Sequence, residues 1–496
     1  MTTMLRARTF LLGTAAALSS LTSLHGEYVK PGPESNFTIH PDQPRQTIKG
    51  LGFEIQSDSI ASGNKGMPEE ISGVPHDLTP DERARFCKEM LHGFRYCRLA
   101  GGLYWRGLDA DKKQFVPRWP EQGAELRDMI RDAGVEGVLY EYWSPAPFWK
   151  ASGKLIGPGW NNKLRCYTSK FKDDPDYHGD VDAFLRDFAA ACTKDLQTLR
   201  DAGIPISMWG LQNEPFANTG YSSCVYSPAE YSRTFTAVAP AIRAFDPKIW
   251  ITGDDADTKY ILPALSNPAT AKLLDAFTVH QVGVNAAVVK GPATPKGFDQ
   301  PSFEDEYEYL QGPTSPGRCM NTVQYIMNWF QRGQSPVWFW IHALKPIGNV
   351  EASGYGLGFW RPPAYNGPIP DAYSSLQPGH WTWNKYNWNS VACFLKRMPW
   401  DSRAVTVDEE TVSESLRIFS FLRPDGKLVV VLSNRSSAPH TFHINTGING
   451  ASFQGWRYTP EDDQPDGLGK KIDATQQGPT ISPQLEAQTW EFWEQT

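Results

Sequence analysis

Two segments of the 496-residue chain carry the side chains best suited to catalysis. The first is residues 209–215, Trp-Gly-Leu-Gln-Asn-Glu-Pro, where a strand-like run ends in an Asn-Glu pair followed by proline. Glu214 could act there as a general acid, and Asn213 could donate a hydrogen bond to a sugar hydroxyl. The second is residues 301–308, Pro-Ser-Phe-Glu-Asp-Glu-Tyr-Glu, which holds four acidic residues within five positions. Cleavage of a glycosidic bond requires two carboxylates of this kind.

Both segments also allow a purely structural interpretation. Glu214 could simply cap the helix that follows its strand, and residues 304–308 could form a solvated acidic face. Periodicity does not select a nucleophile within the second segment. Glu304, Glu306 and Glu308 share one parity along a strand, whereas Asp305 has the other.

The elements that would position these residues alternate between strand and helix. Thr79-Pro80 and the Ser227–Glu230 pattern are typical helix starts, and residues 181–202 form a long amphipathic helix. Strand-like runs occur at residues 47–54, 94–99, 135–142, 204–211, 250–252, 276–282, 302–307 and 337–341. This alternation predicts a (β/α)₈ barrel over residues 46–396, with functional groups at the carboxyl ends of its strands. The competing interpretation, a doubly wound open sheet, lacks its Gly-x-Gly-x-x-Gly turn.

Residues 397–496 differ from the rest of the chain. Residues 416–422 and 427–433 are strand-like and are joined by Pro-Asp-Gly, which indicates a hairpin. Further strand-like runs at 440–444 and 489–493 predict an all-β domain.

The amino terminus has the features of an export signal. Arg6 and Arg8 precede an apolar, small-residue run at 10–24, and Gly26 offers a small residue for cleavage. We therefore expect residues 1–26 to be a signal peptide and the protein to be secreted or periplasmic, with no membrane span. An oxidising compartment allows one disulfide among the seven cysteines, and Cys166 with Cys224, both in long loops, is the candidate pair.

Net charge, aromatic content and the absence of metal-binding motifs indicate which kinds of ligand the protein could bind. The formal net charge is −7 and there is no basic stripe, which argues against a nucleic-acid binder. The chain contains 18 Trp, 19 Tyr and 25 Phe, and such aromatic content suits stacking against flat ligand faces. No His-Glu-x-x-His motif and no dense aspartate loop occurs, so we expect neither a metal nor a cofactor.

Taken together, the motifs resemble glycoside hydrolase family 30, a retaining family of clan A, and within it the glucosylceramidase-like enzymes. The similarity runs along nearly the whole mature chain, in a shared order. The similar segments are residues 50–53 with Ser57-Asp58-Ser59, Arg98, residues 142–150 with 153–155, residues 212–215, Asp254-Asp255, residues 301–307 and residues 432–436.

The resemblance implies a function and a set of site residues. It places the nucleophile on Glu306 and the acid/base on Glu214, with Glu304 or Glu308 as alternatives to Glu306. It implies that residues 27–45 join the C-terminal β-sandwich. Substrate-binding residues would be Asn213, Arg98, Trp143, His280 and Trp340, acting on an oligosaccharide, polysaccharide or glycoconjugate.

The sequence departs from the family pattern around the sugar site. Gln281-Val282 follow His280 in place of an aromatic pair, Phe303 and Asp305 replace Trp and Thr, and Ile341 replaces Asn. These changes leave open the sugar, the linkage and whether cleavage is internal or at chain ends. The changes at Val282 and Ile341 also motivate an alternative, a catalytically silent glycan-binding protein on the same fold.

Overall fold

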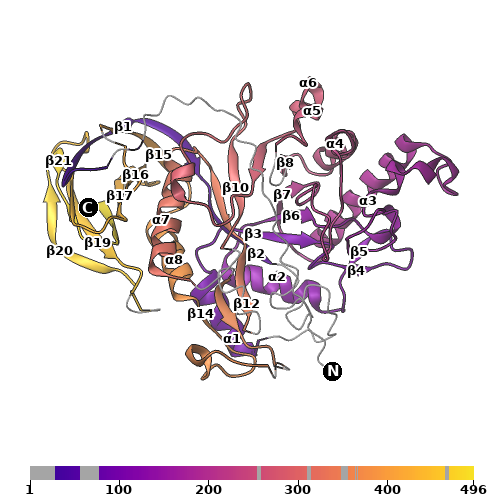
Figure 1. Ribbon diagram of the computed structural model, residues 1–496, viewed down its shortest axis with the longest axis horizontal. Helices are drawn as coiled ribbons and strands as arrows, with labels where there is room; N and C mark the ends of the chain where they lie inside the picture. The colour runs from indigo at the N-terminus through magenta and orange to yellow at the C-terminus, as the bar shows by residue number, and fades with distance from the viewer. Residues whose placement is uncertain are drawn as a thin grey trace, which may run out of the picture.

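A computed structural model gives the architecture of the chain (Figure 1). It describes residues 28, 30–55, 78–253, 258–309, 314–347, 356–363, 365, 367–410, 412–463 and 468–496. The expected signal peptide at 1–26 and the family-like segments 57–59 and 254–255 lie outside the described residues.

Eight parallel strands close into a barrel, as the sequence predicts. Each of the eight strand-like segments supplies one strand, and the last strand pairs with the first through Val337 and Gly50. In barrel order the strands are β2 (Gly50–Ile55), β3 (Tyr96–Gly101), β6 (Gly137–Tyr142), β7 (Ile206–Gly210), β8 (Trp250–Gly253), β9 (Ala276–Val279), β10 (Ser302–Tyr307) and β11 (Val337–Trp340).

Apolar side chains fill the barrel below its carboxyl-terminal end. They form one cluster made of Tyr96, Leu139, Met208, Ala276, Phe303, Val337 and Phe339. A Cβ atom at Gly52 would lie 2.2 Å from the ring of Phe339, so this strand needs a glycine where the aromatic ring crosses it. The packed interior leaves the carboxyl ends of the strands as the place for polar groups.

Helices cover the outside of the barrel. They are α1 (Pro80–Phe86), continued by a π-helical turn η1 (Cys87–Leu91), α2 (Gln122–Ala133), α3 (Val181–Asp201), α4 (Pro228–Phe245), α5 (Leu262–Leu265), α6 (Pro268–Ala271), α7 (Pro316–Gln331) and α8 (Lys385–Arg397). The expected capping box is present at α4, where Ser227 and Glu230 bond each other's backbone N–H. Among the described residues, no helix is long and apolar enough to span a bilayer.

Short elements occupy the loops at the ends of the barrel. The segment after β11 forms a small sheet of β12 (His342–Pro346), β13 (Gly356–Trp360) and β14 (Trp381–Trp383). The others are β4 (Gly107–Leu108), β5 (Phe115–Val116) and the 3₁₀ turns η2 (Pro147–Trp149), η3 (Arg165–Tyr167), η4 (Ser169–Asp173), η5 (Ala286–Val288) and η7 (Asp371–Tyr373).

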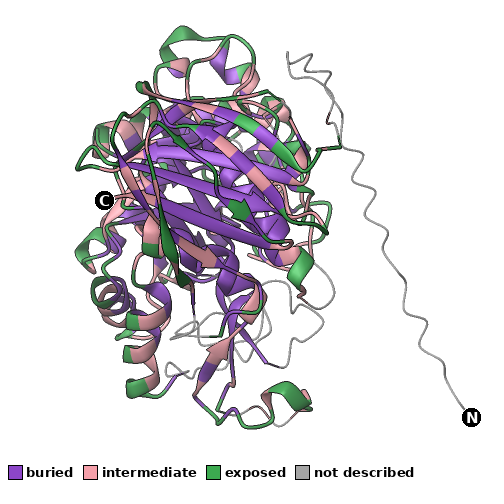
Figure 2. Ribbon diagram, turned by 90° about the vertical axis from the view of Figure 1, so that its left-hand side faces the viewer, coloured by how far each residue is buried: buried purple, intermediate pink, exposed green. Residues whose placement is uncertain are grey.

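The C-terminal residues form the all-β domain. Its strands are β15 (Ser402–Glu409), β16 (Leu416–Leu422), β17 (Leu428–Asn434), β18 (His440–Asn445), β19 (Ser452–Tyr458), β20 (Lys470–Gln477), β21 (Thr480–Ile481), β22 (Gln484–Leu485) and β23 (Thr489–Gln495). The predicted hairpin is present as the antiparallel pair of β16 and β17. The first strand of the chain, β1 (Glu34–Ile48), lies in the same sheet, antiparallel to β15 and parallel to β18. Figure 2, with this domain toward the viewer, shows its strands largely buried.

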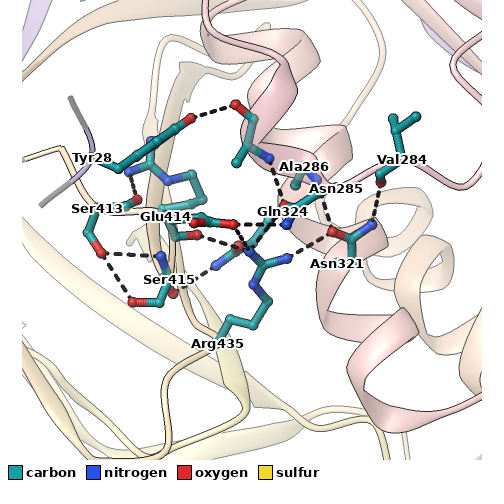
Figure 3. A network of polar contacts seen from close by, with 12 residues as sticks. Tyr28, Val284, Asn285, Ala286, Asn321, Gln324, Ser413, Glu414, Ser415 and Arg435 are labelled. Carbon is teal, nitrogen blue, oxygen red and sulfur yellow. Dashed lines mark hydrogen bonds and ion pairs between the residues drawn. The ribbon is translucent and has the colours of Figure 1, made fainter. Parts of the chain in front are cut away.

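Polar contacts attach the β domain to the barrel helix α7 (Figure 3). Arg435, just after β17, donates to Oδ1 of Asn321 at 2.8 Å and to Oδ1 of Asn285 at 3.3 Å. Gln324 of α7 donates to the carbonyl of Ser415 at 2.9 Å. The β domain is therefore held to the helix that follows β10 and to the loop that follows β9.

The cysteines correct one expectation. All seven are free and buried, so the disulfide expected between Cys166 and Cys224 is not formed. Both side chains belong to the large apolar cluster around the barrel, where a thiol packs as a small hydrophobic group.

Candidate active site

Glu214 and Glu306 meet at the carboxyl end of the barrel. Glu214 follows β7, and Glu306 is the fifth residue of β10. One carboxylate oxygen of each, together with a ring nitrogen of His280, lie within 4.8 Å of one another. Retaining glycosidases hold their two carboxyl groups about 5–5.5 Å apart, whereas inverting enzymes separate them by about 6.5–9.5 Å. The two oxygens are thus closer together than the carboxyl groups of inverting enzymes.

The backbone of Glu214 adopts an uncommon conformation. Its φ of +42° lies in the left-handed region, which costs energy for a residue with a side chain. Its carbonyl accepts a hydrogen bond from the N–H of Ala217 at 2.7 Å, which closes a tight turn. Such strain persists where the surrounding structure enforces it and is concentrated at functional sites. The turn directs the Glu214 carboxylate to Nδ1 of His280, 3.3 Å away.

Arg98 of β3 organises the floor of the site. Its side chain is 0% exposed, so its charge needs partners inside the protein. Its guanidinium donates to Glu306 at 2.7 Å, to Glu54 at 2.6 Å, to Glu141 at 2.6 Å and to Oδ1 of Asn213 at 2.7 Å. Arg98 thus joins the proposed nucleophile to the residue beside the proposed acid/base.

The surrounding charges shift the pKa values of Glu306 and His280 in opposite directions. Burial alone would raise the pKa of Glu306, but the positive charges of His280 and Arg98 outweigh burial and lower it. Burial alone would lower the pKa of His280, but the negative charges of Glu306 and Asp305 and the contact with Glu214 raise it well above its usual value. At neutral pH the site therefore holds an ionised Glu306 beside a protonated His280.

The same trio is the group of described residues that could hold a metal ion. Its imidazole, however, lies between the carboxylates, with Nε2 3.6 Å from Oε2 of Glu306.

A bulge in β10 separates the clustered acids. The pairing register between β10 and β11 shifts between Glu304 and Tyr307, so strict alternation of side chains fails there. Glu304 is buried and accepts hydrogen bonds from the hydroxyl of Tyr325 on α7 at 2.6 Å and from the backbone N–H of Gln281 at 3.0 Å. Burial raises the pKa of Glu304 to about 8, so it is mostly uncharged at neutral pH. Glu304 faces the helix layer, whereas Glu306 faces Arg98.

Of the other two acids in the segment, Asp305 shares its neighbours with Glu306, whereas Glu308 lies beside a different residue. Asp305 is buried, with its carboxylate 3.8 Å from Nε of Arg98 and 3.5 Å from Nε2 of His280. The Glu308 carboxylate lies 3.9 Å from Nε2 of His342 on β12. Asp305 therefore adds to the negative charge around His280, whereas Glu308 lies beside His342.

The two tryptophans expected to bind substrate are both buried. Trp143 lies under Arg98, with its ring centroid 4.4 Å from the guanidinium carbon. Trp340 packs edge-on against Tyr307 at 5.7 Å between ring centroids. Trp143 is 2% exposed and Trp340 is 0% exposed, so stacking of either ring on a sugar stays a prediction.

Sequence reasoning missed several residues of the site. Glu54 on β2 and Glu141 on β6 flank Arg98 from the two neighbouring strands, and each is an acid inside an otherwise apolar strand. That mismatch was a usable signal. Lys345 on β12 helps to lower the pKa of Glu306, and Tyr221 lies close enough to Glu214 and Glu306 for their charges to raise its pKa further, after burial.

We compared the chain with known protein families, curated sequences and solved structures. Residues 401–459 match the model of the glycosyl hydrolase family 30 beta sandwich domain. A search of curated protein sequences finds no match. The family model covers only part of the β domain, whereas the comparison with solved structures also covers the barrel.

The solved structures share the fold over nearly the whole chain. The catalytic domain of the family 30 xylanase C from Talaromyces cellulolyticus aligns with a TM-score of 0.68 at 16% identity, covering 93% of this chain and 100% of that one. A family 30 subfamily 8 xylanase from Clostridium acetobutylicum gives a TM-score of 0.65 at 16% identity, covering 93% and 99%. An endo-β-1,6-glucanase gives 0.63 at 14% identity, covering 92% and 93%.

These comparisons confirm the resemblance to glycoside hydrolase family 30 and its barrel with an appended β domain. The fold and the family match of the β domain both point to a glycoside hydrolase.

Proposed function

We propose that the protein is an exported, retaining glycoside hydrolase that cleaves β-glycosidic bonds by double displacement. One observation carries the proposal: carboxylate oxygens of Glu214 and Glu306 approach within 4.8 Å at the carboxyl end of the barrel. Export rests on Arg6 and Arg8 before the apolar run at 10–24.

The first displacement forms a covalent intermediate. The ionised carboxylate of Glu306 attacks the anomeric carbon while the bond from that carbon to the leaving oxygen breaks. Glu214 gives its proton to the leaving oxygen, which departs as an alcohol. The second displacement reverses these roles. Glu214 removes a proton from water, the water oxygen bonds to the anomeric carbon, and Glu306 leaves as a carboxylate. Two inversions give net retention.

The residues around the pair set the charge of Glu306 and orient Asn213. Arg98 and the protonated His280 lower the pKa of Glu306 and so keep it ionised. Arg98 also holds Oδ1 of Asn213, so the amide nitrogen is the end of that side chain left to bond a sugar hydroxyl.

The substrate class follows from the relatives only at a coarse level. Of the three solved structures compared above, two are described as family 30 xylanases and one as an endo-β-1,6-glucanase. This supports a β-linked glycan for the present chain. The alternative of a catalytically silent glycan-binding protein is not favoured, because both carboxylates are within reach of each other.

Two variants test the nucleophile. We expect Glu306→Gln to lower kcat/KM on p-nitrophenyl β-glycosides by at least about a thousandfold, since an amide cannot form the glycosyl ester. Glu304→Gln is the matched control, because Glu304 is already uncharged at neutral pH and should cost less than about tenfold. Proton NMR of the first product should show the β-anomer. An α-anomer at early times, or an active Glu306→Gln enzyme, would contradict the mechanism.

A further inference from the structure

Large hydrophobic side chains are exposed on the loop that carries Glu214 and on the loop bonded to it. Trp160 is 99% exposed, Phe216 is 47% exposed and Ile156 is 38% exposed. All three lie on the two loops that follow the neighbouring barrel strands β6 and β7. A fully exposed indole gains nothing from burial on folding, and both faces of its ring are open to solvent, where a ligand can reach them.

The Trp160 loop is attached to the loop that carries Glu214. The backbone N–H of Gly157 donates to the carbonyl of Tyr221 at 3.2 Å, and that of Gly159 donates to Oδ1 of Asn218 at 3.1 Å. Asn162 donates to the same oxygen of Asn218 at 2.9 Å. Trp160 is thus flanked on both sides by residues bonded to Asn218, and its backbone is held in place.

Close packing supports this attachment. A Cβ atom at Gly157 would lie 2.5 Å from the carbonyl oxygen of Thr219, so the two loops touch with no room for a side chain. Buried Lys150 bonds the carbonyls of Leu155 and Ser223 at 2.8 and 2.6 Å, which joins the same two loops a second time. A ring presented by such a loop requires little further ordering of the backbone when it binds a ligand.

The attached loops lead directly back to Glu214. The N–H of Val225 donates to the carbonyl of Asn162 at 2.8 Å, and the N–H of the next residue, Tyr226, donates to the carbonyl of Pro215 at 2.8 Å. Phe216 follows Pro215 immediately. The exposed rings therefore belong to the Glu214 side of the site rather than to the β10 side that carries Glu306.

We propose that Trp160 forms an aromatic platform for a sugar ring on the leaving-group side of the scissile bond, so that the substrate is an oligo- or polysaccharide. The inference rests on the proposed function, in which Glu214 protonates the leaving oxygen, so that the leaving group would lie on the Glu214 side of the scissile bond. A sugar ring has an apolar C–H face that matches a flat indole. The neighbours of Trp160 are glycines and asparagines, which suit a polar ring better than a lipid chain.

The test compares two substrate types in the purified full chain. The glycans are soluble xylan, β-1,3-, β-1,4- and β-1,6-glucans and β-galactan, and the small substrates are p-nitrophenyl β-xyloside, β-glucoside and β-galactoside. For Trp160→Ala we expect kcat/KM on the cleaved glycan to fall about tenfold relative to kcat/KM on the aryl glycoside, chiefly through KM. Trp160→Phe should restore most of the loss. Val288→Ala, at another exposed hydrophobic residue on a different loop, is the matched control and should leave the ratio at its wild-type value.

A second measurement separates this proposal from the proposed function. Affinity electrophoresis in gels containing each glycan, with Glu306→Gln protein, should show retardation that Trp160→Ala abolishes. An unchanged ratio in Trp160→Ala, or wild-type protein that hydrolyses aryl glycosides but neither cleaves nor binds any of these glycans, would overturn the platform. A loss shared equally by both substrate types would also overturn it, because Trp160 would then act through loop folding. Failure on every aryl glycoside and every glycan, with retardation retained, would instead refute the hydrolase function.

Discussion

Replacing His280 by asparagine tests whether a buried imidazolium sets the charge of the proposed nucleophile. The asparagine amide keeps a hydrogen-bonding group near Glu214 but removes the positive charge beside Glu306. In the wild-type protein burial alone would raise the pKa of Glu306 from its ordinary 4.5, but the charge of His280 and the charge and hydrogen bond of Arg98 lower it. Protonation of Glu306 abolishes nucleophilic attack, so the acidic limb of activity should lie below pH 4.5 in the wild type.

The structure gives the size of the expected shift. Nε2 of His280 lies 3.6 Å from Oε2 of Glu306. At an effective dielectric constant of about 20, two unit charges at that distance attract by about 5 kcal/mol, or roughly three pKa units. This is an upper bound, because Glu306 is 12% exposed and water will partly replace the lost charge. We expect the acidic limb of the variant to move upward by about 1–3 pH units.

The assay is the pH dependence of kcat/KM on an aryl β-glycoside, which reports ionisations of the free enzyme. His342→Asn is the matched control. His342 is equally buried, but burial and the nearby charges of Lys345 and Arg98 lower its pKa well below 6.5. It is therefore neutral, and its replacement removes no charge. An acidic limb that stays in place in His280→Asn, or moves equally in His342→Asn, would refute this account of the site.

Two further predictions address the proton donor and the domain interface. Glu214→Ala should slow substrates with poor leaving groups by at least about a hundredfold while sparing 2,4-dinitrophenyl glycosides, and azide should restore turnover as a β-glycosyl azide; equal losses on both substrate types without azide rescue would remove Glu214 from the acid/base role. Arg435→Met should lower the free energy of unfolding by about 1–3 kcal/mol, because it leaves side-chain oxygens of Asn321 and Asn285 without this donor. Denaturant titration measures the loss, Arg435→Lys should recover part of it, and an unchanged midpoint would show that the contacts of Figure 3 do not stabilise the chain.

Local patterns in the sequence determined the architecture. The eight barrel strands formed where β-branched and aromatic runs alternate with helical periodicity, because burial of an apolar face is decided by the order of residues along one element. The capping box of Ser227 and Glu230 and the hairpin turn at 424–426 were equally readable, since each involves groups only a few residues apart.

The site could be predicted only in part, because most of its contacts join residues that are far apart in the sequence. The sequence placed Glu214 after a strand end, and its resemblance to a family pointed to Glu306. Alternation along β10 left Glu304, Glu306 and Glu308 equivalent. The bulge removed that equivalence by turning Glu304 toward Tyr325 and Glu306 toward Arg98, and a bulge depends on pairing with another strand.

Charge and exposure were decided by tertiary structure alone. Glu54 and Glu141 lie far from Arg98 in sequence and meet it because β2, β3 and β6 are adjacent in the barrel. The glycines and asparagines around Trp160 indicate a loop but not the exposure of its ring, which is 99% exposed while Trp340 in a barrel strand is fully buried. Exposure and pKa both depend on what the rest of the chain brings near a side chain, which a one-dimensional pattern does not contain.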